Sequence, residues 1–173
     1  MGIKFRRPHY DYAQKARKAD DIQMQQQVFS RKLGTVMVED EREIIYIDES
    51  TFNLWQYPTR AWLAKGMGIT LAETRGKSIT IIGAISEDRG LVHYDLIVGS
   101  NNAETFSKFL LALKSKCPAP AVVVLDNLAV HKAKDVVAIY DRRFKELLLP
   151  PYSCTLNPIE RLWSRIKTEW RKT

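Results

Sequence analysis

The sequence has few of the residues on which disulfide-rich, zinc-binding or membrane-spanning proteins depend. Only two of its 173 residues are cysteine, Cys117 and Cys154, and they form no CxxC pair. Neither a disulfide framework nor a zinc cluster is therefore indicated. The apolar runs are all shorter than the roughly 18 residues that suggest a membrane span. The opening segment MGIKFRRPHY contains no apolar stretch of the signal-peptide kind. We expect a protein that works inside the cell, without a membrane.

Signatures of several common enzyme classes are missing as well. There is no GxGxxG or GxxxxGK[ST] loop and no nucleophile elbow, which argues against dinucleotide-binding, P-loop and α/β-hydrolase proteins. The three histidines, His9, His93 and His131, lie in unrelated segments. A phosphatase of the haloacid-dehalogenase type needs a second aspartate two positions after the one that ends its first strand. Ser50 stands at that position.

What the sequence does contain is apolar material for one domain and an unevenly spread positive charge. Apolar residues make up 45% of the chain, and the net charge is +7. Residues 1–35 carry eight Lys/Arg against three Asp/Glu, and residues 157–173 carry five against two, which leaves the middle at −1. Two basic ends favour a polyanionic partner, with a simple solvated basic surface as the alternative. We divide the chain into a basic linker or helical arm (1–42) and one folded domain (43–173).

The hydrophobic pattern predicts an α/β domain. We expect strands at 43–49, 77–86 and 90–98, a helix at 103–116, a strand at 121–126, a helix at 131–143, a strand at 145–150 and a helix at 157–170. Residues 51–57 (TFNLWQY) fit a loop or small hairpin, and residues 11–33 a helix or arm outside the core. Short crossovers through helices require parallel neighbours. The order βββαβαβα with a mixed sheet and helices on both faces is that of the ribonuclease H-like fold.

Three acids fall at the ends of these predicted elements. Asp48 closes the first strand, Asp126 closes the strand at 121–126, and Glu160 opens the last helix. Ligand sites in open α/β sheets form where strands end, so the three side chains can converge. Carboxylates brought together repel one another unless a cation compensates, and oxygen ligands favour Mg²⁺ or Mn²⁺. Two such ions can activate an attacking oxygen and stabilise a leaving oxygen in phosphoryl transfer.

Each acid also has a purely structural interpretation. Asp48 suits a strand-end turn, and the adjacent Glu49 competes with it, although the two point to opposite faces of an ideal strand. Asp126 could cap the following helix, but Asn127 could do so instead. The segment NPIE at 157–160 resembles a capping box, in which Glu160 reaches back to the cap amide. Spacing alone does not choose between these interpretations.

Five segments together resemble the catalytic-domain motifs of DDE transposases of the mariner superfamily, in the family's order and over roughly residues 44–170. They are YIDEST (46–51), YPTRAWLAKG (57–66), RGKSITIIGAIS (75–86), LDNLAVHKA (125–133) and LPPYSCTLNPIERLWSRIK (149–167). The last is the most specific. It departs from the family at Cys154, where proline commonly follows PPYS. No proposed ligand is affected by that departure.

The resemblance implies that Asp48, Asp126 and Glu160 form the metal-binding catalytic triad of a DNA endonuclease and polynucleotidyl transferase, which uses two Mg²⁺ or Mn²⁺ ions to cut DNA at transposon ends and join it to target DNA. It places Trp62 in a loop motif. The residues that we expect to contact DNA are basic or polar: Arg6, Arg7, Lys65, Arg75, Lys77, Asn127, His131, Arg161 and Arg165.

The resemblance also sets the expected partners and the alternatives. We expect DNA as the partner and a homodimer in the DNA complex, in the nucleus if the source is eukaryotic and in the cytoplasm if it is bacterial. Family members usually carry paired helix-turn-helix units upstream. No such pair fits before Glu43, so we expect a catalytic fragment. The alternatives are a domesticated or inactive core that only binds DNA, and a structure-specific nuclease that does not join strands.

Overall fold

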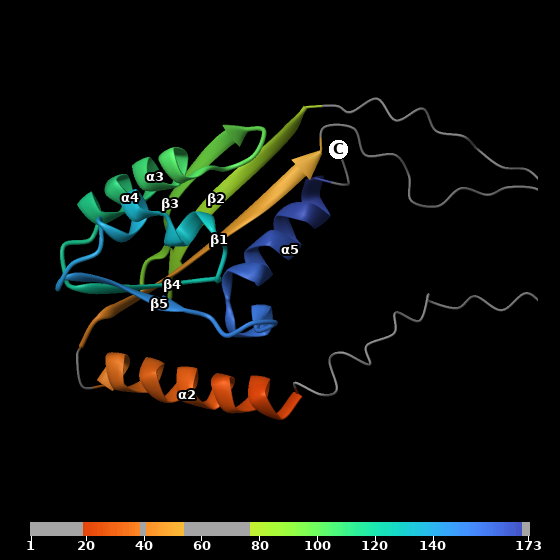
Figure 1. Cartoon of the computed structure of the whole chain (residues 1–173). Coiled ribbons are helices and arrows are strands. Elements are labelled where there is room, and N and C mark those ends of the chain that lie inside the picture. Colours follow the sequence, from red (N-terminus) through yellow and green to blue (C-terminus); the bar gives the residue numbers. More distant parts are fainter. Residues whose placement is uncertain (1–18, 39–40, 54–76, 171–173) are drawn as a thin grey trace, which may run out of the picture.

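A computed structural model describes residues 19–38, 41–53 and 77–170, which form a mixed five-stranded sheet with helices on both faces (Figure 1). The elements in chain order are α2 (Ala19–Val38), β1 (Glu43–Asn53), β2 (Ser78–Ser86), β3 (Gly90–Val98), α3 (Ala103–Ser115), β4 (Ala121–Leu125), the 3₁₀ turn η1 (Val130–Lys132), α4 (Lys134–Val137), β5 (Phe144–Leu148), the 3₁₀ turn η2 (Cys154–Leu156) and α5 (Ile159–Trp170). None of the helices described here is both long and apolar enough to span a membrane.

The strand order is β3-β2-β1-β4-β5. β2 pairs antiparallel with both β1 and β3, whereas β4 is parallel to β1 and β5 is parallel to β4. The parallel pairs are joined through helical crossovers, as short connections between parallel strands require. The predicted α/β class, the order of the strands and helices, and the mixed sheet are all confirmed.

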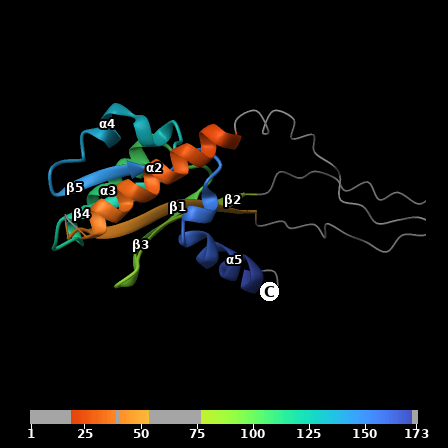
Figure 2. The same ribbon diagram turned by 90° about the horizontal axis from the view of Figure 1, so that it is seen from below.

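Alternation along the strands assigns the two faces of the sheet. Ile45 and Ile47 of β1 face α3, in a core cluster with Val123 and Leu125 of β4. This cluster also contains Phe106, Phe109, Leu110 and Leu113, the buried residues of α3. On the opposite face Val124 packs with Leu149 and with Phe29 of α2. Figure 2 shows α2 running across that face, in front of the sheet in this view.

Three local predictions need correction. The sequence pattern places the segment at 11–33 outside the core, but α2 runs from Ala19 to Val38 and buries Phe29. β1 does not end after Glu49: it continues to Asn53 because β2 pairs with it along that whole length. The helix expected at 131–143 is only the turn η1 followed by the single turn α4.

Candidate active site

Asp48 and Asp126 lie side by side at the end of β4. The parallel pairing of β1 and β4 reaches Tyr46 opposite Val124, and each aspartate comes two residues further along its own strand direction. β4 stops at Leu125, whereas β1 continues beside β2 with Asp48 opposite Gly83. Asp48 therefore sits within a strand and not at its end, where the sequence pattern places it. The strand that ends beside Asp48 is β4. Ligand sites in open α/β sheets form at such strand ends.

Glu160 approaches the same place from α5. This helix packs against β1 and β2, and Glu160 is exposed in its first turn. The buried Trp163, one turn further on, donates its indole N–H to Oδ2 of Asp48 at 2.9 Å. The amide of Asn157, just before the helix, donates to the main-chain oxygen of Ile47 at 3.4 Å. α5 is thus tied to the part of β1 that carries Asp48.

The structure resolves the capping question at Glu160. In a capping box the main-chain N–H of the cap residue would be satisfied by the acid three positions on. Here the N–H of Asn157 donates instead to the carbonyl oxygen of Cys154 at 2.9 Å. The side-chain oxygen of Asn157 accepts from the N–H of Ile159 at 3.4 Å. Asn157 caps the helix without help from Glu160, so the Glu160 carboxylate is available for another role.

The electrostatics of Asp48 reflect this crowding of carboxylates. Burial, followed by the negative charges of Glu160 and Asp126, raises the pKa of Asp48 to about 6. Hydrogen bonds from the main-chain N–H of Glu49 and from Trp163 oppose the rise without cancelling it. A carboxyl group with a raised pKa and two acidic neighbours favours a bound cation.

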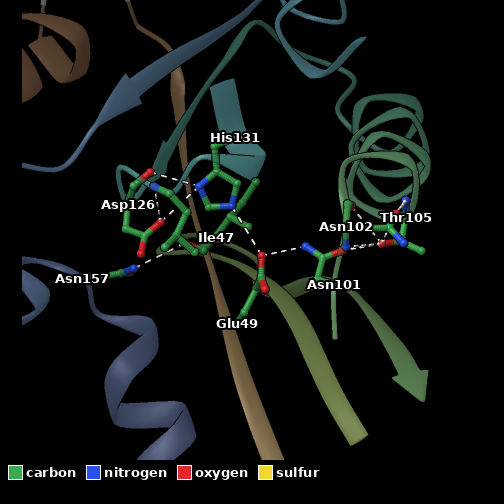
Figure 3. A network of polar contacts seen from close by, with 9 residues as sticks. Ile47, Glu49, Asn101, Asn102, Thr105, Asp126, His131 and Asn157 are labelled. Atoms are coloured by element: carbon green, nitrogen blue, oxygen red, sulfur yellow. Dashed lines mark hydrogen bonds and ion pairs between the residues drawn. The ribbon is translucent and has the colours of Figure 1, made fainter. Parts of the chain in front are cut away.

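His131 holds Asp126 from the α3 side of the sheet (Figure 3). Its Nδ1 lies 3.0 Å from the main-chain oxygen of Asp126 and 3.1 Å from Oδ1 of the same residue. Both atoms accept hydrogen bonds, so Nδ1 must carry the proton. Oδ1 also accepts the N–H of Leu128 at 3.2 Å. One oxygen of Asp126 is thereby fixed by two donors, whereas the side chain as a whole is 44% exposed.

The other nitrogen of His131 faces Glu49. Nε2 lies 3.4 Å from Oε1 of Glu49, and Asn101 donates its amide N–H to the same oxygen at 2.7 Å. Burial disfavours the charged imidazole, but hydrogen bonds to the carboxylates of Asp126 and Glu49 outweigh it and raise the pKa of His131 to about 9. Asp48 and Glu49 point to opposite faces as expected, and Glu49 belongs to this second network and not to the metal side.

The network continues into α3. The hydroxyl of Thr105 donates to Oδ1 of Asn101 and accepts the main-chain N–H of Asn102. The main-chain N–H of Thr105 in turn donates to Oδ1 of Asn102. These reciprocal bonds form a capping box at the start of α3. The chain of contacts from Asp126 through His131 and Glu49 thus ends on a rigid helix terminus (Figure 3).

The acids suit a hard divalent ion by donor type, although they do not enclose one. Within residues 19–38, 41–53 and 77–170, no three His, Cys, Asp or Glu side chains are placed to share a metal. Mg²⁺ keeps several waters and binds through one or two carboxylates plus substrate phosphate oxygens, so a closed protein cage is not required. Asp48 and Asp126 supply the adjacent pair, and Glu160 stands on the facing helix.

The predicted DNA-contacting residues divide into three groups. Arg6, Arg7, Lys65 and Arg75, together with Trp62 of the loop motif, lie outside the described residues. Lys77, Asn127, Arg161 and Arg165 are exposed, the two arginines on α5. His131 is only 2% exposed and packs in a tilted orientation against Phe106, with 4.3 Å between ring centroids. Its nitrogens are turned into the protein, so the structure shows it holding Asp126.

Two site residues escape prediction from the sequence. Trp163 has the pattern of a core residue of an amphipathic helix, and Gly83 that of an ordinary residue of a strand. A glycine in a strand interior often marks a close approach of another group. Here a Cβ at position 83 would lie 2.9 Å from Cη2 of Trp163. That signal, combined with a tryptophan one turn after Glu160, could have indicated the contact.

The strand order, the central acids and the C-terminal helix that returns across β1 define a ribonuclease H-like α/β domain. The chain belongs to the DDE superfamily endonucleases, because that family's model matches residues 43–173. This confirms the resemblance seen in the sequence. A search of curated protein sequences finds no match.

Solved structures of Mos1 mariner transposase share the fold. The strand transfer complex has a TM-score of 0.64 at 17% identity, covering 98% of this chain and 52% of that one. The paired-end complex with Mn has the same score and identity, covering 96% and 53%. The isolated catalytic domain has a TM-score of 0.61 at 15% identity, covering 98% and 77%. This chain therefore spans about half the length of the transposase chains in those complexes.

Proposed function

We propose that this chain is the catalytic domain of a DNA transposase, which cuts DNA at transposon ends and joins the freed 3′-hydroxyl to target DNA. The observation that carries the proposal is the adjacency of Asp48 and Asp126 at the end of β4, with Glu160 close enough on α5 to raise the pKa of Asp48. Membership of the DDE superfamily endonucleases supports the reaction class.

Asp48, Asp126 and Glu160 would hold two Mg²⁺ or Mn²⁺ ions. Such ions, when bound, activate an attacking oxygen and stabilise the leaving oxygen of a phosphodiester. The protein's own contribution is to fix one oxygen of each aspartate, through Trp163 and His131, so that the other oxygen faces the site. Water is the nucleophile for cleavage, and the 3′-hydroxyl is the nucleophile for joining. No covalent enzyme intermediate is needed.

The DNA itself would be held mainly through phosphates. Arg161 and Arg165 stand one turn apart on the exposed side of α5, and arginine matches phosphate geometry well. One of the Mos1 structures is a paired-end complex with the left transposon end, and another is a strand transfer complex. By that likeness we infer the same class of DNA partner here, and a homodimer in the DNA complex.

The test is a joining assay with one matched pair of variants. A short duplex with a free 3′-hydroxyl is incubated with supercoiled plasmid, Mn²⁺ and the protein, and both nicked plasmid and joined product are measured. Asp126→Asn should abolish both products without loss of folding, because it removes one charge from the acidic cluster. Asp135→Asn, the same change at an exposed position of α4, should leave both products unchanged.

The outcomes separate the candidate functions. Nicking and joining that both depend on Asp126 support a transposase. Nicking without joining supports a structure-specific nuclease, and DNA binding without either product supports an inactive core. Full activity of a folded Asp126→Asn protein would remove the triad from consideration.

A further inference from the structure

A buried polar contact links α5 to β1 inside the site. Trp163 is 2% exposed, and its indole N–H, the only polar group of the side chain, donates to Oδ2 of Asp48 at 2.9 Å. Hydrogen bonds to a charged acceptor are stronger than neutral ones. The contact leaves Oδ1 as the oxygen of Asp48 that is free of the indole.

Gly83 makes this contact sterically possible. It lies directly opposite Asp48 on β2. A Cβ at this position would meet Cη2 of Trp163 at 2.9 Å and Cζ2 at 3.2 Å, and Cδ1 of Ile159 at 3.3 Å. Its φ is not in the positive range, so the backbone conformation would accept alanine. The requirement for glycine comes mainly from the closeness of the indole, with Ile159 as a second, less close neighbour.

The same helix carries the third acid. Glu160 precedes Trp163 by three residues, and residues spaced in this way are neighbours on a helix surface. A contact that fixes the indole against Asp48 therefore also fixes the distance between Asp48 and Glu160. The bond from Asn157 to the main-chain oxygen of Ile47 is a second tie between the start of α5 and the same stretch of β1.

We propose that Trp163 is a positioning residue for the metal site, which holds Asp48 by its indole N–H and sets its distance from Glu160, and that Gly83 provides the space for the ring. The proposal rests on the proposed function, since it assumes that Asp48 binds metal. It goes further by assigning roles to two residues that are not among the proposed metal ligands. Outer contacts of this kind typically change metal affinity about 10- to 100-fold when they are removed.

Trp163→Phe is the main test variant, because phenylalanine retains an aromatic ring and loses the donor. Mn²⁺ affinity, measured by calorimetry, should fall about 10- to 100-fold. The matched control is Trp170→Phe. Trp170 lies on the same helix, is 38% exposed and has its ring 5.7 Å from that of Phe52. This control should bind Mn²⁺ like the wild type.

Gly83→Ala approaches the same contact from the other side. It leaves the donor and all three acids unchanged but pushes the indole away from Asp48, so Mn²⁺ affinity should fall and the melting temperature should drop. In a Trp163→Phe background the added methyl group meets a smaller ring, so Gly83→Ala should lower the Mn²⁺ affinity and the melting temperature by less. Equal costs in both backgrounds would overturn the steric part of the proposal.

A readout that needs no metal keeps the result separate from the proposed function. The indole N–H resonance of Trp163, assigned by its loss in Trp163→Phe, should shift in Asp48→Asn protein, whereas that of Trp170 should not. A resonance that does not respond overturns the contact. Unchanged Mn²⁺ affinity in folded Trp163→Phe overturns the positioning role. Wild-type protein that binds Mn²⁺ but cuts no DNA would contradict the proposed function while leaving the positioning role supported by the affinity data.

Discussion

His131 contacts Asp126 through two acceptors of the same residue, its main-chain oxygen at 3.0 Å and its carboxylate Oδ1 at 3.1 Å. One imidazole thereby fixes both the backbone at the end of β4 and the rotation of the acid that follows it. The opposite nitrogen is held by Glu49, a residue of β1. Two neighbouring strands are thus cross-linked by a buried side chain beside the candidate metal site.

Removing the donors of His131 should weaken this region even without metal. His131→Phe keeps a ring packed against Phe106 but leaves the two carboxylates without their shared donor. We expect a loss of about 1 to 3 kcal/mol in the free energy of unfolding, the usual cost of leaving polar groups unsatisfied, together with reduced DNA cleavage. Urea unfolding measures the first effect. Glu49→Gln retains an acceptor for His131 and Asn101 and should lose less stability. A larger loss in this variant would contradict the proposed network.

Glu160 should contribute to activity and not to helix stability. Because Asn157 caps α5 through its own side chain and its N–H donates to the carbonyl oxygen of Cys154, both Glu160→Gln and Glu160→Ala should stay within about 0.5 kcal/mol of the wild type. Both should lose Mn²⁺-dependent cleavage almost completely. Melting temperature and plasmid nicking measured on the same preparations provide the test. Near-normal nicking by Glu160→Gln would mean that the third ligand lies elsewhere.

The loop before β5 should give the protein a measurable pH dependence. The Lys114 ammonium, followed by the N–H groups of Phe144 and Arg143, lowers the pKa of Asp141 to about 2. Since the pKa is depressed in the folded state, the stabilisation is fully present above the ordinary value near 4 and is lost as the pH falls through about 2. The gap in urea midpoint between wild type and Asp141→Asn should therefore narrow from about pH 5 to about pH 2.5. In a Lys114→Gln background the pKa of Asp141 should be lowered less, so the gap in urea midpoint should close at a higher pH. A gap that does not depend on pH would contradict the assignment.

DNA binding should depend on salt through α5. Replacing Arg161 and Arg165 together by glutamine should weaken binding to any sequence and lower the slope of log affinity against log salt by about 1 for each phosphate that the protein no longer neutralises. Fluorescence anisotropy with a labelled duplex at several salt concentrations gives both values. Lys134→Gln combined with Lys145→Gln makes the same change in net charge on α4 and β5. This control should affect the slope less, and an equal effect would indicate that the whole surface acts as a diffuse charge.

The fold was largely predictable because its signals are local. The buried run AVVVL is too short and too β-branched to be anything but a buried strand, and Asn101 and Asn102 offer a cap for the helix predicted from residue 103. Where prediction failed, the deciding partner was distant in sequence or lay in an unforeseen turn. β1 runs on to Asn53 because β2 pairs with it there, and α4 is cut short because Asp141 accepts the N–H groups of Arg143 and Phe144 and so turns the chain into β5.

The candidate site was predictable in composition but not in geometry. Residue types and their order made Asp48, Asp126 and Glu160 candidates, and the family's motifs pointed to the same three. The contacts that orient these acids come from Trp163 and His131. Both are buried residues whose polar atoms are satisfied only by tertiary structure. An amphipathic pattern predicts that such a side chain is buried in the protein core. It does not predict which carboxylate accepts a hydrogen bond from the N–H group of that side chain.

The placement of Glu160 and Trp163 on α5 has a consequence for synthesis. A nascent chain that has emerged only as far as β5 already contains every strand of the sheet, with Asp48 and Asp126 adjacent, but it has neither the third acid nor the indole that holds the first. Chains fold from the N-terminal side as they leave the ribosome. The candidate site is therefore completed only after the strands of the described sheet, so a translation product stalled before α5 would carry these strands without a complete site.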